Sequence, residues 1–250
     1  FAISHMLKEG KNLCVATSSG NTGAALSAYC AAAKIRCVIA VVDGITQAKT
    51  QQMLSYGAEL YEINNFGKDP QVTEKTFELI RKQGESGNAS FQISAYKFSP
   101  IGMAGVQKIS FELEKQLKTI NHIFCPAGGG GLTLSIAHGF DNLLYMKKID
   151  HFPIIHCVQP LGNDTMASSL RLGLPRGREV QCKTKISGLQ VPNLIDADAV
   201  IKHLKHRNGQ GHVVRDELVF TVQKKLAAEE GIFSEPAGAT ALAGLYEAVK

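Results

Sequence analysis

Residues 13–42 read LCVATSSGNTGAALSAYCAAAKIRCVIAVV, and this stretch decides the fold class. The apolar run Leu13–Ala16 predicts a strand, the alanine-rich Thr22–Ala33 predicts a helix, and the almost continuous apolar run Arg36–Val42 predicts a second strand. Apolar strands separated by helices are typical of a parallel sheet, because a parallel connection needs a long crossover. We therefore expect an α/β protein with helices on both faces of its sheets.

The same alternation continues outward along the chain. Further helices are predicted at Gln47–Tyr56, Pro70–Gln83, Gly102–Leu117, Leu132–Phe140 and Asp164–Leu172, with strands at Glu59–Ile63, Ser90–Ser94, His122–Cys125 and Ile154–Gln159. Between Gly173 and Gly211 the alternation loosens around one short helix near Ala197–His206. A helix Asp216–Glu230, capped by Asp216, and a final helix from Ala237 follow. We place a domain boundary near Lys97–Gly102, which gives a smaller α/β domain at 1–100 and a larger one at 101–250.

Composition and charge exclude several classes of protein. The 250 residues are 44% hydrophobic and 20% charged, unlike disordered, collagen-like or disulfide-scaffold chains. The net charge of +5 is spread along the chain, and the longest apolar runs are far too short to cross a bilayer. Four of the six cysteines (Cys14, Cys37, Cys125, Cys157) lie in apolar strand-like runs, as buried structural thiols do. We expect a cytoplasmic protein that binds neither nucleic acid nor membrane.

The loop Ser18-Ser19-Gly20-Asn21-Thr22-Gly23 follows the first predicted strand and precedes a helix. At that place, backbone N–H groups and the positive end of the helix dipole form an anion site. The short polar side chains around it suit a carboxylate ligand. The alternative is a simple cap and turn, which uses the same residue types.

The second loop, Pro126-Ala127-Gly128-Gly129-Gly130-Gly131-Leu132, follows the strand His122–Cys125. Four consecutive glycines let a backbone wrap closely round a phosphate with successive N–H groups pointing inward. The loop lacks the Lys-Ser/Thr pair of a nucleotide P-loop and the spacing of a dinucleotide fingerprint. A flexible connector is the other interpretation, and phosphate binding is favoured.

Together, SSGNTG and PAGGGGL resemble the paired loops of the fold type II pyridoxal-phosphate enzymes, which include threonine synthase, threonine and serine dehydratases and the tryptophan synthase β subunit. Further similarity lies in Gln47–Glu59, Pro100–Glu114 and Glu230–Gly244, so the resemblance covers nearly the whole chain. The segment SPIGMAGVQKISFELEKQL and residues Ser187–Pro192 look most like threonine synthase. The resemblance implies two parallel-sheet, helix-covered domains and pyridoxal 5'-phosphate as cofactor.

The resemblance also implies residue roles. Asn21 would hydrogen-bond the phenolic oxygen of the cofactor ring, and Gly188 would pass near the ring edge. Glu235 and Ala237 would line the pocket around the ring. The substrate carboxylate would be held by Ser18, Ser19, Gly20 and Thr22, and the cofactor phosphate by backbone N–H groups of Gly128, Gly129, Gly130, Gly131 and Leu132.

Two family residues have no counterpart in the sequence. The Schiff-base lysine of the family lies further upstream of the asparagine than the 20 residues that precede Asn21 allow, so it is expected before Phe1 and the catalytic residue is unassigned. Lys8 and Lys11 are too close to Asn21 to replace it. The partner of the pyridine nitrogen is expected beyond Lys250. Both ends read as helices without start or stop signals, so we expect a chain truncated at both ends.

The resemblance implies a lyase that acts on an amino acid by elimination, in the manner of threonine synthase, which converts O-phosphohomoserine to threonine. Two alternatives stay open: a threonine or serine dehydratase, and a catalytically inactive homologue that only binds the cofactor. A phosphorylated substrate needs a second anion site, which Arg176, Lys183 and Lys185 would supply unless they are ordinary solvated surface. A homodimer is expected from the family.

Overall fold

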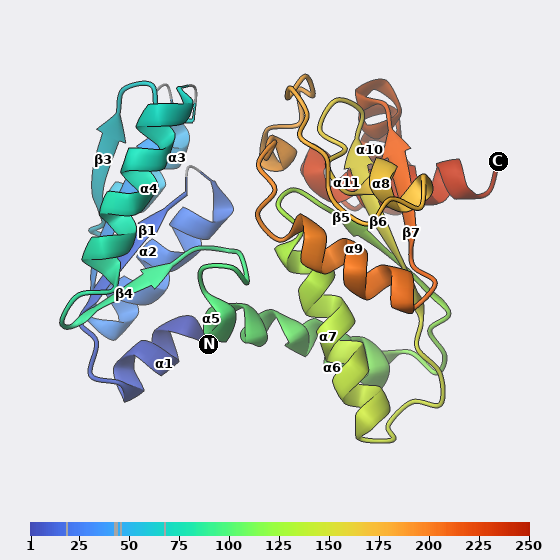
Figure 1. Ribbon diagram of the computed structural model, residues 1–250, viewed down its shortest axis with the longest axis horizontal. Helices are drawn as coiled ribbons and strands as arrows, with labels where there is room; N and C mark the ends of the chain where they lie inside the picture. The colour runs from blue at the N-terminus through green and yellow to red at the C-terminus, as the bar shows by residue number, and fades with distance from the viewer. Residues whose placement is uncertain (19, 43–44, 46, 68) are drawn as a thin grey trace. The chain divides into compact units, whose positions relative to one another are not determined.

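The computed structural model describes residues 1–250 except residues 19, 43, 44, 46 and 68. The chain divides into two compact units, Phe1–Gly105 and Val106–Lys250, each built on its own parallel sheet (Figure 1). The predicted α/β class with helix-covered parallel sheets is thereby confirmed. Within the described residues, every helix is too short or too polar to cross a membrane.

The first unit has a four-stranded sheet in the order β3-β2-β1-β4, with every pair parallel. Its strands are β1 (Leu13–Thr17), β2 (Arg36–Val42), β3 (Glu59–Ile63) and β4 (Ala89–Gln92). Its helices are α1 (Ala2–Lys8), α2 (Asn21–Ala33), α3 (Gln47–Ser55), α4 (Pro70–Gly84) and α5 (Pro100–Ala104). Helix α4 covers one face of this sheet, and α2 and α3 lie on the other (Figure 1).

The strand order of the first unit reverses at β1. Strands β2 and β3 continue to one side of β1, whereas β4 lies on its other side. In open parallel sheets, ligands bind outside the carboxyl ends of the strands at such a reversal, because the loops there diverge to opposite faces. Strand β1 ends at Thr17, so the loop at residues 18–23 begins at this switch point.

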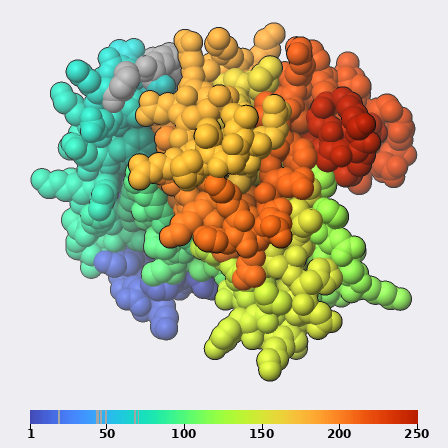
Figure 2. Space-filling view, turned by 45° about the vertical axis from the view of Figure 1, so that its right-hand side comes forward, coloured from blue at the N-terminus to red at the C-terminus, as the bar shows by residue number. Residues whose placement is uncertain are grey.

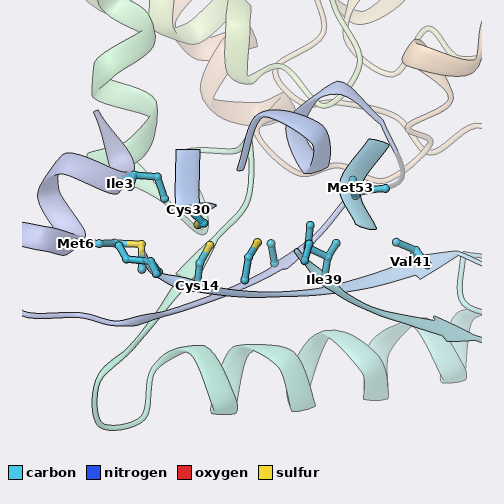
Figure 3. Close-up of a cluster of buried hydrophobic side chains, with 11 residues drawn as sticks. Ile3, Met6, Cys14, Cys30, Ile39, Val41 and Met53 are labelled. Atoms are coloured by element: carbon cyan, nitrogen blue, oxygen red, sulfur yellow. The ribbon is translucent and has the colours of Figure 1, made fainter. Parts of the chain in front are cut away.

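The core of the first unit lies between the sheet and helices α1 to α3. It contains buried side chains from all of these elements, several of which are drawn in Figure 3: Ile3, Met6, Cys14, Cys30, Ile39, Val41 and Met53. The strand cysteines Cys14, Cys37, Cys125 and Cys157 are all buried, as their apolar sequence surroundings predict.

The second unit has a three-stranded parallel sheet in the order β5-β6-β7. Its strands are β5 (His122–Pro126), β6 (Ile154–Pro160) and β7 (Gln210–Val214). Its helices are α6 (Lys108–Gln116), α7 (Gly131–Tyr145), α8 (Ala167–Arg171), α9 (Ala197–His206), α10 (Asp216–Glu230) and α11 (Pro236–Ala248), with the short 3-10 turns η1 (Gly105–Gln107) and η2 (Ser187–Leu189). The segment between α8 and α9 lies on the surface, coloured gold in Figure 2.

Three sequence predictions need correction. The stretch expected to be irregular up to Gly211 contains the start of β7, which was not predicted because Gln210 and His212 interrupt its apolar pattern. The helix expected at Gly102–Leu117 is divided into α5, η1 and α6. Asp216 does not cap α10: its carboxylate accepts hydrogen bonds from Thr184 Oγ1 at 2.7 Å and from the Lys185 amide at 2.7 Å, so it ties down the irregular segment instead.

Candidate functional site

The loop after β1 is closed by one side chain. Ser18 Oγ accepts hydrogen bonds from the amides of Gly20 at 3.3 Å and Gly23 at 3.0 Å. The bond to Gly23 satisfies an N–H group in the first turn of α2 that has no partner within the helix. The Ser18 hydroxyl therefore fixes the loop against α2, which is the capping role that was the alternative interpretation of this motif. Ser19 lies outside the described residues.

The start of α2 needs glycine at position 23. A Cβ at Gly23 would lie 2.7 Å from both Met53 Sδ and the Ser18 carbonyl oxygen, so a side chain there would push the helix off the loop. Gly20 has open space around its Cβ position, Asn21 is exposed and Thr22 is half-buried. The first turn of α2, with its positive dipole end, is thus accessible at the carboxyl end of β1.

The loop after β5 needs glycine at position 130 for two reasons. Gly130 has a φ of +99°, a conformation that side chains oppose. Its Cβ position lies 2.9 Å from Val200 Cγ2 and 3.0 Å from Met166 Sδ, so there is also no room for a methyl group. The backbone conformation and the neighbouring side chains therefore both require glycine at position 130, directly before helix α7.

The carbonyl groups of this loop are held by the rest of the second unit. Gln159 Nε2 donates to the Gly128 carbonyl at 3.3 Å, and the Asp196 amide donates to the Gly129 carbonyl at 3.1 Å. In a trans peptide the N–H group of the next residue points opposite to the carbonyl. The amides of Gly129 and Gly130 therefore point away from these partners. Together with the first amides of α7, they are the donors that this loop, called the cradle below, can offer to an anion such as a phosphate group.

The structure brings Gly188 and Ala237 next to this cradle. The Gly188 carbonyl oxygen lies 3.7 Å from the Cβ position of Gly128, and the Cβ position of Gly188 lies 2.9 Å from Ala237 Cβ. Glu235 is exposed and precedes α11. Thr240 is buried, and its hydroxyl donates to the Pro236 carbonyl at 3.0 Å, which is a structural role within the helix.

Three buried residues around the cradle were missed by the sequence analysis: Gln159, Asn163 and Asp196. Besides holding Gly128, Gln159 accepts the amides of Met166 at 2.7 Å and Ala167 at 2.9 Å. Asn163 Nδ2 donates to the Leu189 carbonyl, which fixes the segment that carries Gly188. A glutamine inside the apolar strand IIHCVQP was the available signal, since a buried amide needs partners.

The basic residues weighed as a Schiff-base lysine or as a second anion site lie on the surface. Lys8 is exposed on α1, and Lys11 Nζ donates to the Gly87 carbonyl at 2.8 Å. Arg176, Lys183 and Lys185 are all exposed, in agreement with the interpretation that they are solvated surface.

Comparison with known proteins now decides the family. A family model described as "Pyridoxal-phosphate dependent enzyme" matches residues 1–250. The chain belongs to this family. It is 28% identical over 251 residues to the threonine synthase of Methanosarcina acetivorans, covering 99% of the chain and 60% of that relative. The threonine synthase of Methanocaldococcus jannaschii is 26% identical over 91% of the chain and 55% of its own length. The chain thus spans little more than half the length of these relatives.

Solved structures confirm the fold of this pyridoxal-phosphate family member. An L-serine ammonia-lyase from the fungus Rhizomucor miehei superposes with a TM-score of 0.79 at 18% identity, over 100% of this chain and 75% of that one. Serine racemase from Dictyostelium discoideum gives a TM-score of 0.73 at 22% identity, over 98% and 74%. The fold type II arrangement expected from the two loops is therefore confirmed.

The glycine cradle fits the phosphate of the family's cofactor. The outward amides of Gly129 and Gly130 and the first amides of α7 offer several donors to one anion.

Proposed function

We propose that the chain binds pyridoxal 5'-phosphate through the cradle at Gly128–Gly131 and the amide of Leu132. The observation that supports this most strongly is Gly130, where both the positive φ and the neighbouring atoms demand glycine directly before a long helix. Gly188 is proposed to pass near the ring edge, and Asn21 to hydrogen-bond the phenolic oxygen of the ring.

The accessible start of α2 is proposed to bind the carboxylate of an amino-acid substrate. Gly20 and Thr22 would contribute to this site with Ser19, and Ser18 would hold the loop in shape through its bonds to Gly20 and Gly23. The helix dipole favours a carboxylate at this position. When bound, pyridoxal phosphate would supply a ring that withdraws electrons from the substrate α-carbon, and the loop would hold the substrate carboxylate.

We propose that the reaction is an elimination of the threonine synthase type, which converts O-phosphohomoserine to threonine. The similarity to relatives named threonine synthase over nearly the whole chain supports this choice. A threonine or serine dehydratase is the second candidate, because an ammonia-lyase shares the fold. A homologue that binds the cofactor without turnover is the third candidate.

Cofactor binding is tested by the variant Gly130→Ala. We expect its dissociation constant for pyridoxal phosphate, measured by absorbance titration, to rise at least about tenfold, because the positive φ and the contacts with Val200 and Met166 force the loop to move. Gly231→Ala is the matched control: Gly231 also has a positive φ, of +66°, but open space around its Cβ position and a place at the end of α10. Equal affinity in both variants would contradict the proposed cradle.

Turnover is tested by product analysis with two substrates. Release of phosphate with formation of threonine from O-phosphohomoserine is expected for the threonine synthase reaction. Release of ammonia and a 2-oxo acid from threonine or serine indicates the dehydratase. Cofactor binding without any product from the full-length gene product indicates the inactive homologue.

The assembly and location are proposals of the same kind. We propose a homodimer in the cytoplasm, and sedimentation of the purified protein measures its mass in solution directly.

A further inference from the structure

Three cysteines from different elements meet inside the first unit. Cys14 lies on β1, Cys37 is its register partner on β2, and Cys30 is on α2 above them. One Sγ atom from each lies within 4.8 Å of the other two. Figure 3 shows the sulfur atoms of Cys14 and Cys30 turned toward one another.

The surroundings of this cluster are mostly apolar and include the buried Ser27 hydroxyl beside Cys37. Cys14 and Cys30 are 0% exposed, and Cys37 is 4% exposed. The other buried members of the same core are uncharged side chains: Ile3, Met6, Ala16, Ile35, Ile39, Val41, Met53 and Ala58. All six cysteines of the chain are free thiols. Any group bound among these sulfurs therefore has to carry little net charge.

The spacing of the sulfurs suits a three-coordinate centre. An arsenic(III) centre keeps a lone pair and is pyramidal, so three bonds of roughly 2.3 Å place its sulfurs about 3.4 Å apart. The three Sγ atoms lie within 4.8 Å of one another, so closing round such a centre requires each to move by about 1 Å or less. We propose that Cys14, Cys30 and Cys37 form a three-sulfur site for a trivalent thiophilic centre of the arsenic(III) type.

Charge selects the trivalent centre over the commoner metal ions. Three thiolates and one arsenic(III) make a neutral group, which an apolar core tolerates. The same thiolates leave a charge of minus one around Zn²⁺ and minus two around Cu⁺, and burying such a charge is costly. Zn²⁺ also prefers four ligands, whereas the group that could hold an ion among the described residues consists of these three side chains.

The binding step is balanced without an oxidant. Arsenous acid, As(OH)₃, loses its three As–O bonds and forms three As–S bonds, while the three thiol protons leave with the hydroxyl groups as three water molecules. Arsenic stays in the trivalent state and no sulfur is oxidised. This site is separate from the proposed cofactor cradle and does not depend on it.

The first test uses arsenite and the reduced protein. The variant Cys125→Ala/Cys157→Ala/Cys182→Ala keeps only the three cysteines of the cluster, and it removes the buried pair of neighbours on β5 and β6. We expect both this variant and the wild type to retain one arsenic per chain after desalting, with three sulfur neighbours in X-ray absorption spectra. Fewer than three sulfur neighbours in the wild type, or no retained arsenic, would overturn the proposal.

The second test removes one ligand. Cys37→Ala is expected to weaken arsenite binding at least about tenfold and to abolish the rise in melting temperature that arsenite gives the wild type. Unchanged binding in Cys37→Ala, or tighter binding of Zn²⁺ than of arsenite by the wild type, would contradict a three-sulfur trivalent site. If Cys37→Ala does not fold, the wild-type spectra decide.

Discussion

Gln159 shows how a single residue shapes the cradle without being part of it. Its side chain is fully buried at the end of β6 and uses both ends of the amide. The oxygen accepts the amides of Met166 and Ala167, and the nitrogen donates to the Gly128 carbonyl and to Thr165 Oγ1 at 3.0 Å. Gln159 therefore acts through Gly128 as a positioning residue.

Two substitutions at Gln159 distinguish the role of the amide oxygen from that of the amide nitrogen. Gln159→Leu leaves buried backbone groups without partners and is expected to lower the free energy of unfolding by roughly 3 kcal/mol. Gln159→Glu keeps an acceptor for Met166 and Ala167 but loses the donor to Gly128, and its negative charge opposes an anion in the cradle. We therefore expect Gln159→Glu to bind inorganic phosphate more weakly than the wild type, by more than its lower free energy of unfolding alone would cause.

Urea unfolding and phosphate titration measure these two effects. Gln116→Leu, at an exposed position in the last turn of α6, is the control and should leave both unchanged. Phosphate affinity of Gln159→Glu equal to that of the wild type would show that Gln159 has no influence on the cradle.

At the scale of elements, the sheet of the second unit carries a row of three histidines across its strands. His122 Nδ1 lies 3.0 Å from His156 Nε2, and His156 Nδ1 lies 2.8 Å from His212 Nε2. The ring of Phe124 stacks on His156 with a centroid distance of 4.0 Å. Burial, together with the neighbouring His212 and His122, lowers the pKa of His156 to about 4. Burial also lowers the pKa of His212.

This row predicts a loss of stability in acid. An unfolded histidine has a pKa of about 6.5, so between about pH 6.5 and pH 4 the unfolded chain binds a proton that folded His156 does not. The free energy of unfolding should therefore fall as the pH falls through this window and level off below it. His156 alone accounts for a change on the order of 3 kcal/mol. Urea unfolding between about pH 7 and pH 5 measures the slope.

His156→Phe should flatten this slope even though it removes two hydrogen bonds and lowers the stability itself. His206→Gln, at an exposed position on α9, should leave the slope as it is in the wild type. The same slope in His156→Phe and the wild type would show that the acid sensitivity comes from other groups, such as His212, whose pKa is also lowered by burial.

For the whole molecule, the sequence predicted the elements whose apolar pattern is simple. Strands β2 and β3 and helices α9 and α10 have the predicted bounds. Strand β7 was not predicted, because the polar residues Gln210 and His212 interrupt its apolar pattern. Its pairing with β6 is known only from the fold. Both loops lie between a strand and a helix, as their composition predicts, and their roles in binding stay predictions.

The support around the loops could not be predicted in the same way. Gln159, Asn163 and Asp196 reach the cradle region from segments far from it in sequence, so their partners depend on the tertiary fold. The capping role of Ser18 and the anchoring role of Asp216 likewise depend on which amides the fold brings near each oxygen.

The reversal of strand order at β1 also has a consequence for synthesis on the ribosome. Strand β1 pairs with β2 soon after both are made, but its other edge is completed by β4, after α2, α3 and α4 have been added. Until Ala89–Gln92 leave the exit tunnel, a central strand of the finished sheet has an open edge. A nascent chain of this protein can therefore pair β1 wrongly during the interval between the synthesis of β1 and that of β4.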